Sequence, residues 1–311
     1  MNGMELAEGY YKEYGEPLLR GEFSEYAPLI AAGLAGEGSE CFGYDDEISR
    51  DHDFGPGFCF WITEKTARDI GGKLQEAYRG LPAEYGGVTR IETPEGAARV
   101  GVITIEDFYR KYIGCPGAPS NVLDWFRIPE RYLAIVTSGK VFRDPEGTFT
   151  EIRETLLGFY PEDVLRKKLA ARAAVMAQSG QYNFPRSLKR GEKEAAWMAL
   201  HEFVKAALSA IFLLNREYAP FYKWIFRRAG ELTILQDTVT SLMKLVDMSV
   251  SEDGAWMTEM IEDICVSIER EIVRQGFAET HDQFMQAYCP DIMAGIKDPQ
   301  LAGLPAIYDI D

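Results

Sequence analysis

The stretch that decides the fold is GSECFGYDDEISRDHDFGPGFCFW, residues 38–61. It begins with a Gly-Ser turn and ends in the apolar run Phe58–Ile62, which predicts a buried strand. Between them lie six acidic residues and a single arginine; the acids are Glu40, Asp45, Asp46, Glu47, Asp51 and Asp53. Carboxylates this close together repel one another unless a cation lies between them, so the stretch predicts a metal site.

Asp51 and Asp53 are the expected metal ligands. They flank His52 just before the strand, and period-2 alternation sends both carboxylates to the same side, where they could hold one or two Mg²⁺ or Mn²⁺ ions. The ordinary alternative is a solvated Asp-rich turn before a strand, and Asp-His-Asp alone would favour it. The upstream Gly-Ser turn, the adjoining strand and the helical second half of the chain favour the metal site.

Gly38 and Ser39 are the expected phosphate-binding residues. The backbone N–H groups of such a turn and the Ser39 hydroxyl can donate to phosphate oxygens. A metal held by the two aspartates would bridge to a nucleoside triphosphate (NTP) and neutralise charge as a nucleotidyl or phosphoryl group moves.

Composition bounds the class of protein. The chain has 311 residues and a net charge of −16, without a basic patch that would neutralise nucleic-acid phosphates. Metal-bridged phosphates or a cationic substrate would suit the charge, but solubility explains it equally well. Five cysteines without CxxC spacing indicate reduced thiols, and there is neither an apolar leader nor a run of about 18 apolar residues. We therefore expect a cytoplasmic protein that contacts no membrane.

The first half of the chain mixes helical and strand patterns. Helices are predicted over 4–20, 63–79 and 106–112, and extended segments over 28–36, 58–62, 88–93, 99–105 and 140–144. The strands at 88–93 and 99–105 are expected to form a hairpin through the turn at 94–96. This half predicts an α+β domain, residues 1–150, with a mixed or antiparallel sheet.

The second half, residues 151–311, is helical in pattern. The expected helices are Pro161–Ser179, Glu192–Asn215, Pro220–Arg228, Leu232–Val246 and Ala255–Gln275, followed by an irregular tail after Pro290. The pattern predicts an all-helical bundle, which we expect to bind the substrate.

Two groups of residues in the helical half could contact a nucleotide or an acceptor. Arg186 and Arg190 belong to a basic cluster in a predicted loop and could clamp phosphates, or could simply pair with surface acids. Asn215, Tyr218 and Lys223 surround a predicted helix break and could stack a base or hold the acceptor. The usual explanation of aromatic residues at helical spacing is core packing.

The motif Gly-Ser, spacer, Ser-x-Asp-x-Asp, followed by a helical domain, resembles the polymerase-β-like nucleotidyltransferase superfamily. Within it the chain resembles an uncharacterised bacterial and archaeal family carried as a domain of unknown function. The matching segments are GYDDEISRDHDFGP at 43–56, TSGKVFRD at 137–144, SGQYNFPRSLKRGE at 179–192 and LLNREYAPFYKW at 213–224. Superfamily members with a helical second domain are similar to aminoglycoside nucleotidyltransferases. The resemblance implies that Gly38 and Ser39 hold the triphosphate and that Asp51 and Asp53 bind the metal.

The chain also departs from the superfamily pattern. The spacing from Ser39 to Asp51 is two residues longer than usual, and the third carboxylate that active members carry on a neighbouring strand is not evident. Glu106, at the end of the strand 99–105, is the candidate for it. The alternative for Glu106 is an ordinary acidic residue in the first turn of a helix.

These observations predict a Mg²⁺-dependent nucleotidyltransferase that moves a nucleoside monophosphate from an NTP to a hydroxyl. The acceptor would be a small molecule, such as an aminoglycoside-like compound, or a protein, and a homodimer is left open. The alternative is a catalytically reduced nucleotide-binding module, such as an antitoxin-like partner, because the third acid is not evident. A phosphohydrolase is the third interpretation.

Overall fold

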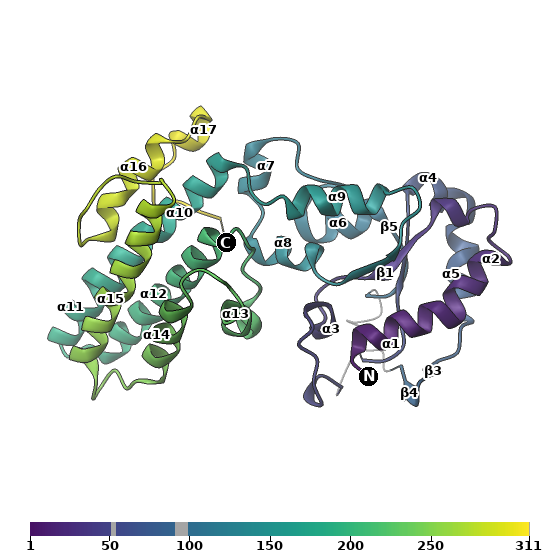
Figure 1. The fold of residues 1–311 in the computed structure, drawn as a ribbon, viewed down its shortest axis with the longest axis horizontal. Helices are drawn as coiled ribbons and strands as arrows, with labels where there is room; N and C mark the ends of the chain where they lie inside the picture. Colours follow the sequence, from purple (N-terminus) through teal and green to yellow (C-terminus); the bar gives the residue numbers. More distant parts are fainter. Residues whose placement is uncertain (51–53, 91–98, 311) are drawn as a thin grey trace. The chain divides into compact units, whose positions relative to one another are not determined.

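The chain folds into two compact units, which we describe one at a time. The structure, a computed structural model, describes residues 1–50, 54–90 and 99–310. The first unit, here called the sheet unit, comprises Met1–Pro119 and Tyr132–Gly158. The second, the helical unit, comprises Ser120–Arg131 and Phe159–Asp311 (Figure 1). The predicted boundary at 150 falls inside α9 (Thr148–Leu157), the last helix of the sheet unit, and the functional division at that point stays a prediction.

The sheet unit is built on one mixed sheet of four strands in the order β5-β2-β1-β6. The strands are β1 (Ala31–Leu34), β2 (Cys59–Ile62), β5 (Gly101–Thr104) and β6 (Lys140–Arg143). Strand β1 runs antiparallel to both β2 and β6, whereas β5 runs parallel to β2. The predicted α+β fold is confirmed.

The hairpin expected between 88–93 and 99–105 is wrong. Strand β4 (Val88–Thr89) pairs with β3 (Glu84–Tyr85), while β5 pairs with β2. Residues 91–98, which include the predicted turn, lie outside the described residues. Period-2 alternation identifies a strand but not its partner, and here the partner comes from a distant part of the chain.

Strand β2 is buried on both faces, which explains its uninterrupted apolar sequence. Phe58, Phe60 and Ile62 share one hydrophobic cluster with residues of α1 (Gly3–Tyr10), α2 (Glu16–Arg20) and α5 (Gly72–Arg79). Trp61 belongs to the opposite face, where its ring stacks on Phe149 of α9 with centroids 3.9 Å apart. Helices therefore cover both faces of the sheet.

A glycine allows β6 to begin beside the end of β1. Gly139 has φ +72°, and a Cβ at this position would overlap the carbonyl oxygen of Leu34. Glycine adopts a positive φ without strain, and the nearby Leu34 backbone leaves no room for a Cβ at residue 139. The Gly-Lys pair at 139–140 is thus where the chain joins the edge of the sheet.

The helical unit is centred on two helices that pack along each other, α10 (Glu162–Met176) and α12 (Lys193–Leu214). Around them lie α7 (Val122–Phe126), α11 (Phe184–Lys189), α13 (Tyr222–Ala229), α14 (Gln236–Asp247), α15 (Gly254–Arg274), α16 (Cys289–Ala294) and α17 (Pro299–Ala302). The five helices expected here all form, with ends within a few residues of the prediction.

Two predicted irregular regions of this unit are helical. The basic loop at 182–190 is the end of a π-helical turn (Ala177–Asn183) followed by α11, and the tail after Pro290 contains α16 and α17. In each case a proline lies in the first turn of the helix, where its missing N–H costs nothing. The predictions of a loop at 182–190 and of an irregular tail after Pro290 were therefore wrong.

The remaining elements are short. They are η1 (Tyr11–Gly15), η2 (Ala27–Leu29), α3 (Ser39–Phe42), η3 (Ile48–Arg50), α4 (Glu64–Thr66), η4 (Ala67–Gly71), α6 (Ile105–Ile113), α8 (Glu130–Thr137) and η6 (Met285–Tyr288). Residues 132–137 belong to α8 and are helical.

One helix passes a length-and-composition test for crossing a membrane. Within the part of the chain that the structure describes, this is α12, and 67% of its apolar window is buried inside the protein. A central helix of a folded core passes the same test, and such burial is typical of one.

Candidate functional site

The Gly38–Ser39 turn follows the carboxyl end of β1. We call this end of the strands, where β2 and β5 begin, the sheet edge. Gly38 precedes the first residue of α3 and has extended backbone angles, φ −68° and ψ 147°. In the antiparallel register Gly33 is opposite Cys59, so the carboxyl end of β1 lies beside the amino end of β2. The residues that precede β2 therefore reach the same edge of the sheet as the turn.

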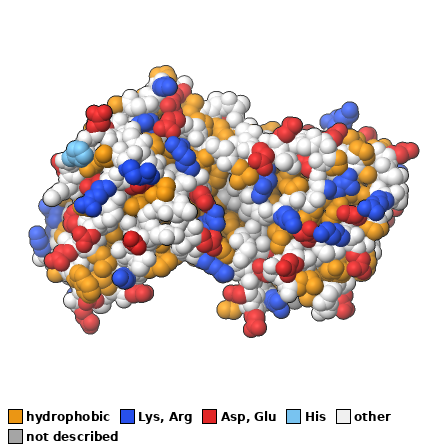
Figure 2. Space-filling view, in the orientation of Figure 1, with side chains coloured by type: hydrophobic (Ala, Val, Ile, Leu, Met, Phe, Trp, Pro, Cys, Tyr) orange, Lys and Arg blue, Asp and Glu red, His pale blue; other side chains and the backbone are white. Residues whose placement is uncertain are grey.

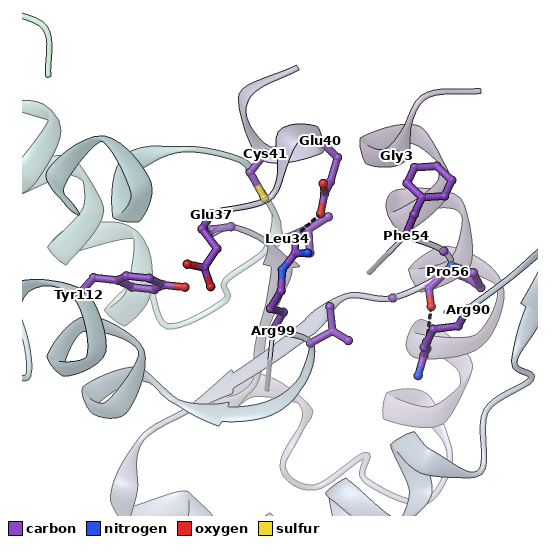
Figure 3. A pocket seen from close by; sticks show the side chains of 15 residues that line it. Gly3, Leu34, Glu37, Glu40, Cys41, Phe54, Pro56, Arg90, Arg99 and Tyr112 are labelled. Atoms are coloured by element: carbon purple, nitrogen blue, oxygen red, sulfur yellow. Dashed lines mark hydrogen bonds and ion pairs between the residues drawn. The ribbon is translucent and has the colours of Figure 1, made fainter. Parts of the chain in front are cut away.

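A small cavity of about 50 Å³ marks this edge (Figure 3). Its lining comes from the turn region, from the segment just before β2 and from the start of β5; the residues are Gly3, Leu34–Glu37, Glu40, Cys41, Phe54–Gly57, Arg90, Arg99, Val100 and Tyr112. Residues that flank the Gly38–Ser39 turn and residues 54–57, which follow the two aspartates in the sequence, thus meet in one hollow. Asp51 and Asp53 lie outside the described residues, and their role as metal ligands stays a prediction.

Arg99 is a functional candidate that the sequence analysis missed. Its guanidinium Nη2 lies 2.8 Å from the Oε1 of Glu40, and the Arg99 side chain is only 20% exposed. A Cβ on Gly38 would overlap both of these atoms, so the ion pair lies directly over the turn. Figure 3 shows the Arg99 and Glu40 side chains with this ion pair between them. A guanidinium presents several donors in a fixed plane and is well suited to phosphate oxygens. The available signal was a single basic residue opening a predicted strand.

Arg90 supports the segment that follows the two aspartates. Its Nε donates to the carbonyl oxygen of Pro56 at 2.6 Å, and its guanidinium lies over the rings of Tyr10 and Tyr78. Because the two rings belong to the core of the sheet unit, Arg90 ties residues 54–57 to a rigid base. This is the support that a binding residue just upstream needs.

The cysteines beside this edge are not nucleophiles. Burial raises the pKa of Cys59 to about 12 and raises that of Cys41 well above its ordinary value. A thiol reacts as the thiolate, and these two thiols stay protonated at neutral pH. They are small apolar members of the core.

Glu106 is not brought to the Gly38–Ser39 turn. It lies in the first turn of α6, and its carboxylate accepts a hydrogen bond from the backbone N–H of Glu64 at 3.0 Å. Thr104 pairs with Ile62, so Glu106 follows the carboxyl ends of β5 and β2, whereas the turn lies at their amino ends. The strands separate the two places by about 10 Å at roughly 3.3 Å per residue. The helix-terminus alternative fits Glu106, and we do not propose it as a third metal ligand.

Other acids lie closer to the turn. Glu37 and Glu40 line the cavity, and Lys111 lies 3.3 Å from the Glu37 carboxylate. No group of three or more His, Cys, Asp or Glu side chains with metal-site geometry occurs among residues 1–50, 54–90 and 99–310. Neither acid belongs to a cluster of that kind among these residues.

The remaining predicted site residues lie in the helical unit. Arg186 and Arg190 are exposed at α11, and the Arg186 guanidinium lies 4.6 Å from the centre of the Tyr182 ring. Lys223 is exposed on α13, with its ammonium 5.2 Å from the ring centres of Phe221 and Trp224. These three cations remain accessible to an anionic ligand.

Asn215 and Tyr218 have structural roles. The Asn215 amide donates to the carbonyl oxygens of Ile211 at 2.8 Å and Ile234 at 3.0 Å, and its carbonyl accepts from the Ile234 N–H. It thereby fastens the end of α12 to the residues before α14. Tyr218 is buried and stacks on Phe159 with centroids 4.8 Å apart, and burial raises its pKa. The core-packing alternative therefore describes Tyr218, and the Asn215 side chain joins two helices.

Three comparisons with known proteins give limited findings. Residues 125–225, 101 of the 311, match the family described as a domain of unknown function, DUF4037. A solved structure of a nucleotidyltransferase-like protein from Exiguobacterium sibiricum 255-15 is similar at 13% identity with a TM-score of 0.40, over 92% of this chain and 81% of that one. No curated protein matches the chain. The matched family region lies outside the Gly38–Ser39 turn, and the structural likeness is too distant to assign a site.

Proposed function

We propose that the chain is a Mg²⁺-dependent nucleotidyltransferase. It would transfer a nucleoside monophosphate from an NTP to an acceptor hydroxyl, with attack of the hydroxyl oxygen on the α-phosphorus and release of pyrophosphate. The observation that carries this proposal is the meeting of two segments at one sheet edge. Residues 34–37, Glu40 and Cys41, which flank the Gly38–Ser39 turn, line the same cavity as residues 54–57, which directly follow the Asp51–Asp53 pair in the sequence.

The donor types at this edge suit a hard cation and a triphosphate. Asp51 and Asp53 would hold Mg²⁺, which prefers carboxylate oxygens and substrate phosphates and supplies charge neutralisation when bound. The Ser39 hydroxyl and the turn N–H groups would receive phosphate oxygens. Arg99 would exchange Glu40 for a phosphate, because the ion pair covers the turn that a triphosphate must reach.

The charge distribution leaves a small-molecule acceptor favoured over nucleic acid. On the face shown in Figure 2, Lys and Arg side chains alternate with Asp and Glu, without a broad basic surface. Binding to a nucleic-acid backbone needs clustered cations. A small molecule or a protein side chain therefore remains the proposed acceptor.

A nucleotide-binding module without turnover is the second candidate. The position of Glu106 at the other end of the β2–β5 pair favours it, since the proposed third carboxylate is then lost. Such a module would bind Mg·NTP at the same turn and release no pyrophosphate.

Calorimetry of Mg·NTP binding tests whether the chain binds nucleotide, which both the transferase and the binding module require. The wild type is expected to bind only when Mg²⁺ is present, and Asp51→Asn with Asp53→Asn is expected to weaken binding by at least tenfold, about 1.4 kcal/mol. Asp69→Asn, an exposed acid of the same unit, is the matched control and should bind as the wild type does.

Pyrophosphate is measured on the same samples. Release that depends on Asp51 and Asp53 supports the transferase. Binding without release favours the module, or means only that the acceptor is missing from the sample. If the folded wild type does not bind any of the four common NTPs with Mg²⁺, the assignment of this sheet edge is wrong.

A further inference from the structure

The helical unit contains a groove of about 1350 Å³. It is formed by α12, by α13 and the residues before it, by Val246 at the end of α14 and residues 248–251 beyond it, and by side chains at 130–131 and on α10. Its whole lining belongs to this unit. The volume exceeds that of a typical small-molecule pocket, about 300–1,000 Å³, so an organic molecule fits without rearrangement.

The walls of the groove are aromatic and aliphatic. The apolar lining includes Trp197, Met198, Phe221, Tyr222, Phe226 and Met248. Trp197 is 56% exposed and Tyr222 is 87% exposed, although both are large apolar side chains. The Trp197 ring is also stacked on His201, with an interplanar angle of 8°. Flat rings held open to solvent around a hollow are typical of a ligand site.

A buried polar cluster forms one part of the lining. Arg172 Nε donates to the Ser209 hydroxyl at 2.7 Å, and that hydroxyl donates to Glu130 at 2.8 Å. All three side chains are more than nine-tenths buried and line the groove. A small number of convergent polar groups in the lining of an apolar pocket can orient a bound small molecule.

The charge of the lining restricts the ligand. Four basic side chains (Arg131, Arg172, Lys193 and Lys205) and three acidic ones (Glu130, Glu194 and Glu202) line the groove, in a chain whose net charge is −16. A site for a polycation would concentrate acids, and this protein has a surplus of them to use. The groove lacks that surplus among its lining residues.

We propose that this groove is a binding site for a small amphipathic molecule with a flat apolar body and an uncharged or singly anionic head. The rings of Trp197 and Tyr222 contact the apolar body, and the Arg172–Ser209 cluster receives the head. The site is distinct from the sheet edge, and the proposal does not depend on nucleotidyl transfer. It differs from a polycationic aminoglycoside-like acceptor, which the balanced charge of the lining does not favour.

The test uses 8-anilino-1-naphthalenesulfonate, which has a flat aromatic body and one sulfonate, titrated into the full chain with fluorescence detection. Trp197→Ala is expected to raise the dissociation constant about tenfold, because it removes one stacking wall. The matched control is Trp256→Ala, since Trp256 is 61% exposed on α15 and does not line the groove. It should change the constant less than twofold.

Competition and size measurements complete the test. A neutral naphthol is expected to displace the probe, and the tricationic amine spermidine is not. Circular dichroism confirms that both variants are folded, and Tyr222→Ala gives an independent second variant at the rim.

Equal affinity of wild type, Trp197→Ala and Tyr222→Ala would overturn the proposal, as would spermidine displacing the probe. Dimers in light scattering that dissociate on Trp197→Ala would show that a second copy occupies the groove, and would also overturn it. Asp51→Asn with Asp53→Asn should leave probe binding unchanged, so this test and that of nucleotide binding fail independently.

Discussion

At the scale of single residues, Glu269 is an acidic residue whose burial disfavours its charged form. It lies on α15 and is 6% exposed. Burial, with nearby Glu262 and Asp282 as smaller causes, raises the pKa of Glu269 to about 7 from an ordinary value of 4.5. The folded state thus prefers the protonated carboxyl at pH values where the unfolded chain has already released the proton.

This predicts a pH dependence of stability with a definite sign. Between pH 4.5 and about 7 the folded state binds more protons at this residue than the unfolded state does, so the free energy of unfolding falls as the pH rises. Glu269→Gln is expected to stabilise the protein at pH 8 by roughly 1–3 kcal/mol, and to have little effect at pH 4.5. Urea unfolding of both proteins at the two pH values measures this.

The control is Glu259→Gln on the same helix, where the glutamate is exposed. It should leave the pH profile of wild type unchanged. A Glu269→Gln variant that is destabilised more at pH 8 than at pH 4.5 would contradict the explanation, because it would show that the carboxylate is favourably paired in the folded state.

Also at this scale, Arg99 and Glu40 show what a sequence motif omits. The Gly-Ser turn was identified from its letters, whereas the ion pair over it joins residues 59 positions apart. Gly38 has no unusual φ, so its conformation does not require glycine. A Cβ at residue 38 would displace the ends of the Arg99 and Glu40 side chains above the turn.

At the scale of elements, α10 holds the C-terminal segment through buried cations. Lys168 Nζ lies 3.0 Å from the Asp309 carboxylate, and Arg172 Nη2 lies 2.6 Å from its other oxygen. Lys167 donates to the carbonyl oxygens of Ala306 and Tyr308. Both lysine side chains are fully buried, so the segment from 306 to 310 satisfies charges that water cannot reach.

Asp309→Asn is therefore expected to destabilise the helical unit by about 3 kcal/mol. Removing one partner of a buried ion pair leaves the remaining charges uncompensated, and the cost exceeds what the intact pair contributes. Thermal unfolding of the full chain, followed by circular dichroism of its helices, measures the loss.

Asp263→Asn, an exposed acid of α15, provides the comparison and should unfold like the wild type. If the two variants unfold at the same temperature, the C-terminal segment does not stabilise α10, and the buried lysines must be balanced in another way.

At the scale of the whole molecule, the two units should respond differently to nucleotide. The proposed nucleotide site is lined by residues of the sheet unit alone. A ligand stabilises the folded state to which it binds by mass action, about 2.7 kcal/mol at a concentration of 100 times its dissociation constant. Mg·NTP should therefore slow amide hydrogen exchange in β1, α3 and β2.

The helical unit supplies the internal control. Exchange in α14 and α15 should not change when Mg·NTP is added, because no residue of these helices lines the cavity at the sheet edge. Protection confined to α11–α13 would instead place the nucleotide in the helical unit and contradict the proposed site.

Sequence patterns determined much of this protein by themselves. The apolar run at 58–62, the helices of residues 161–275 and the change from mixed to helical character follow from local periodicity, because burial of one face or of both imposes a repeat on neighbouring residues. The placement of the Gly-Ser turn just after a strand was predictable for the same reason. Helices α11, α16 and α17 were not predicted. Each has a proline in its first turn, and a proline fits the first turn of a helix as well as it ends one.

Only the tertiary structure decided which distant segments meet. The parallel pairing of β5 with β2 placed Arg99 beside the Gly38–Ser39 turn and put Glu106 at the opposite end of the strands. The same holds for the groove, whose Arg172, Ser209 and Glu130 are contributed by three separate helices. Periodicity reports the environment of a residue along its own element, whereas strand partners and helix neighbours are selected by packing and charge compensation across the whole unit.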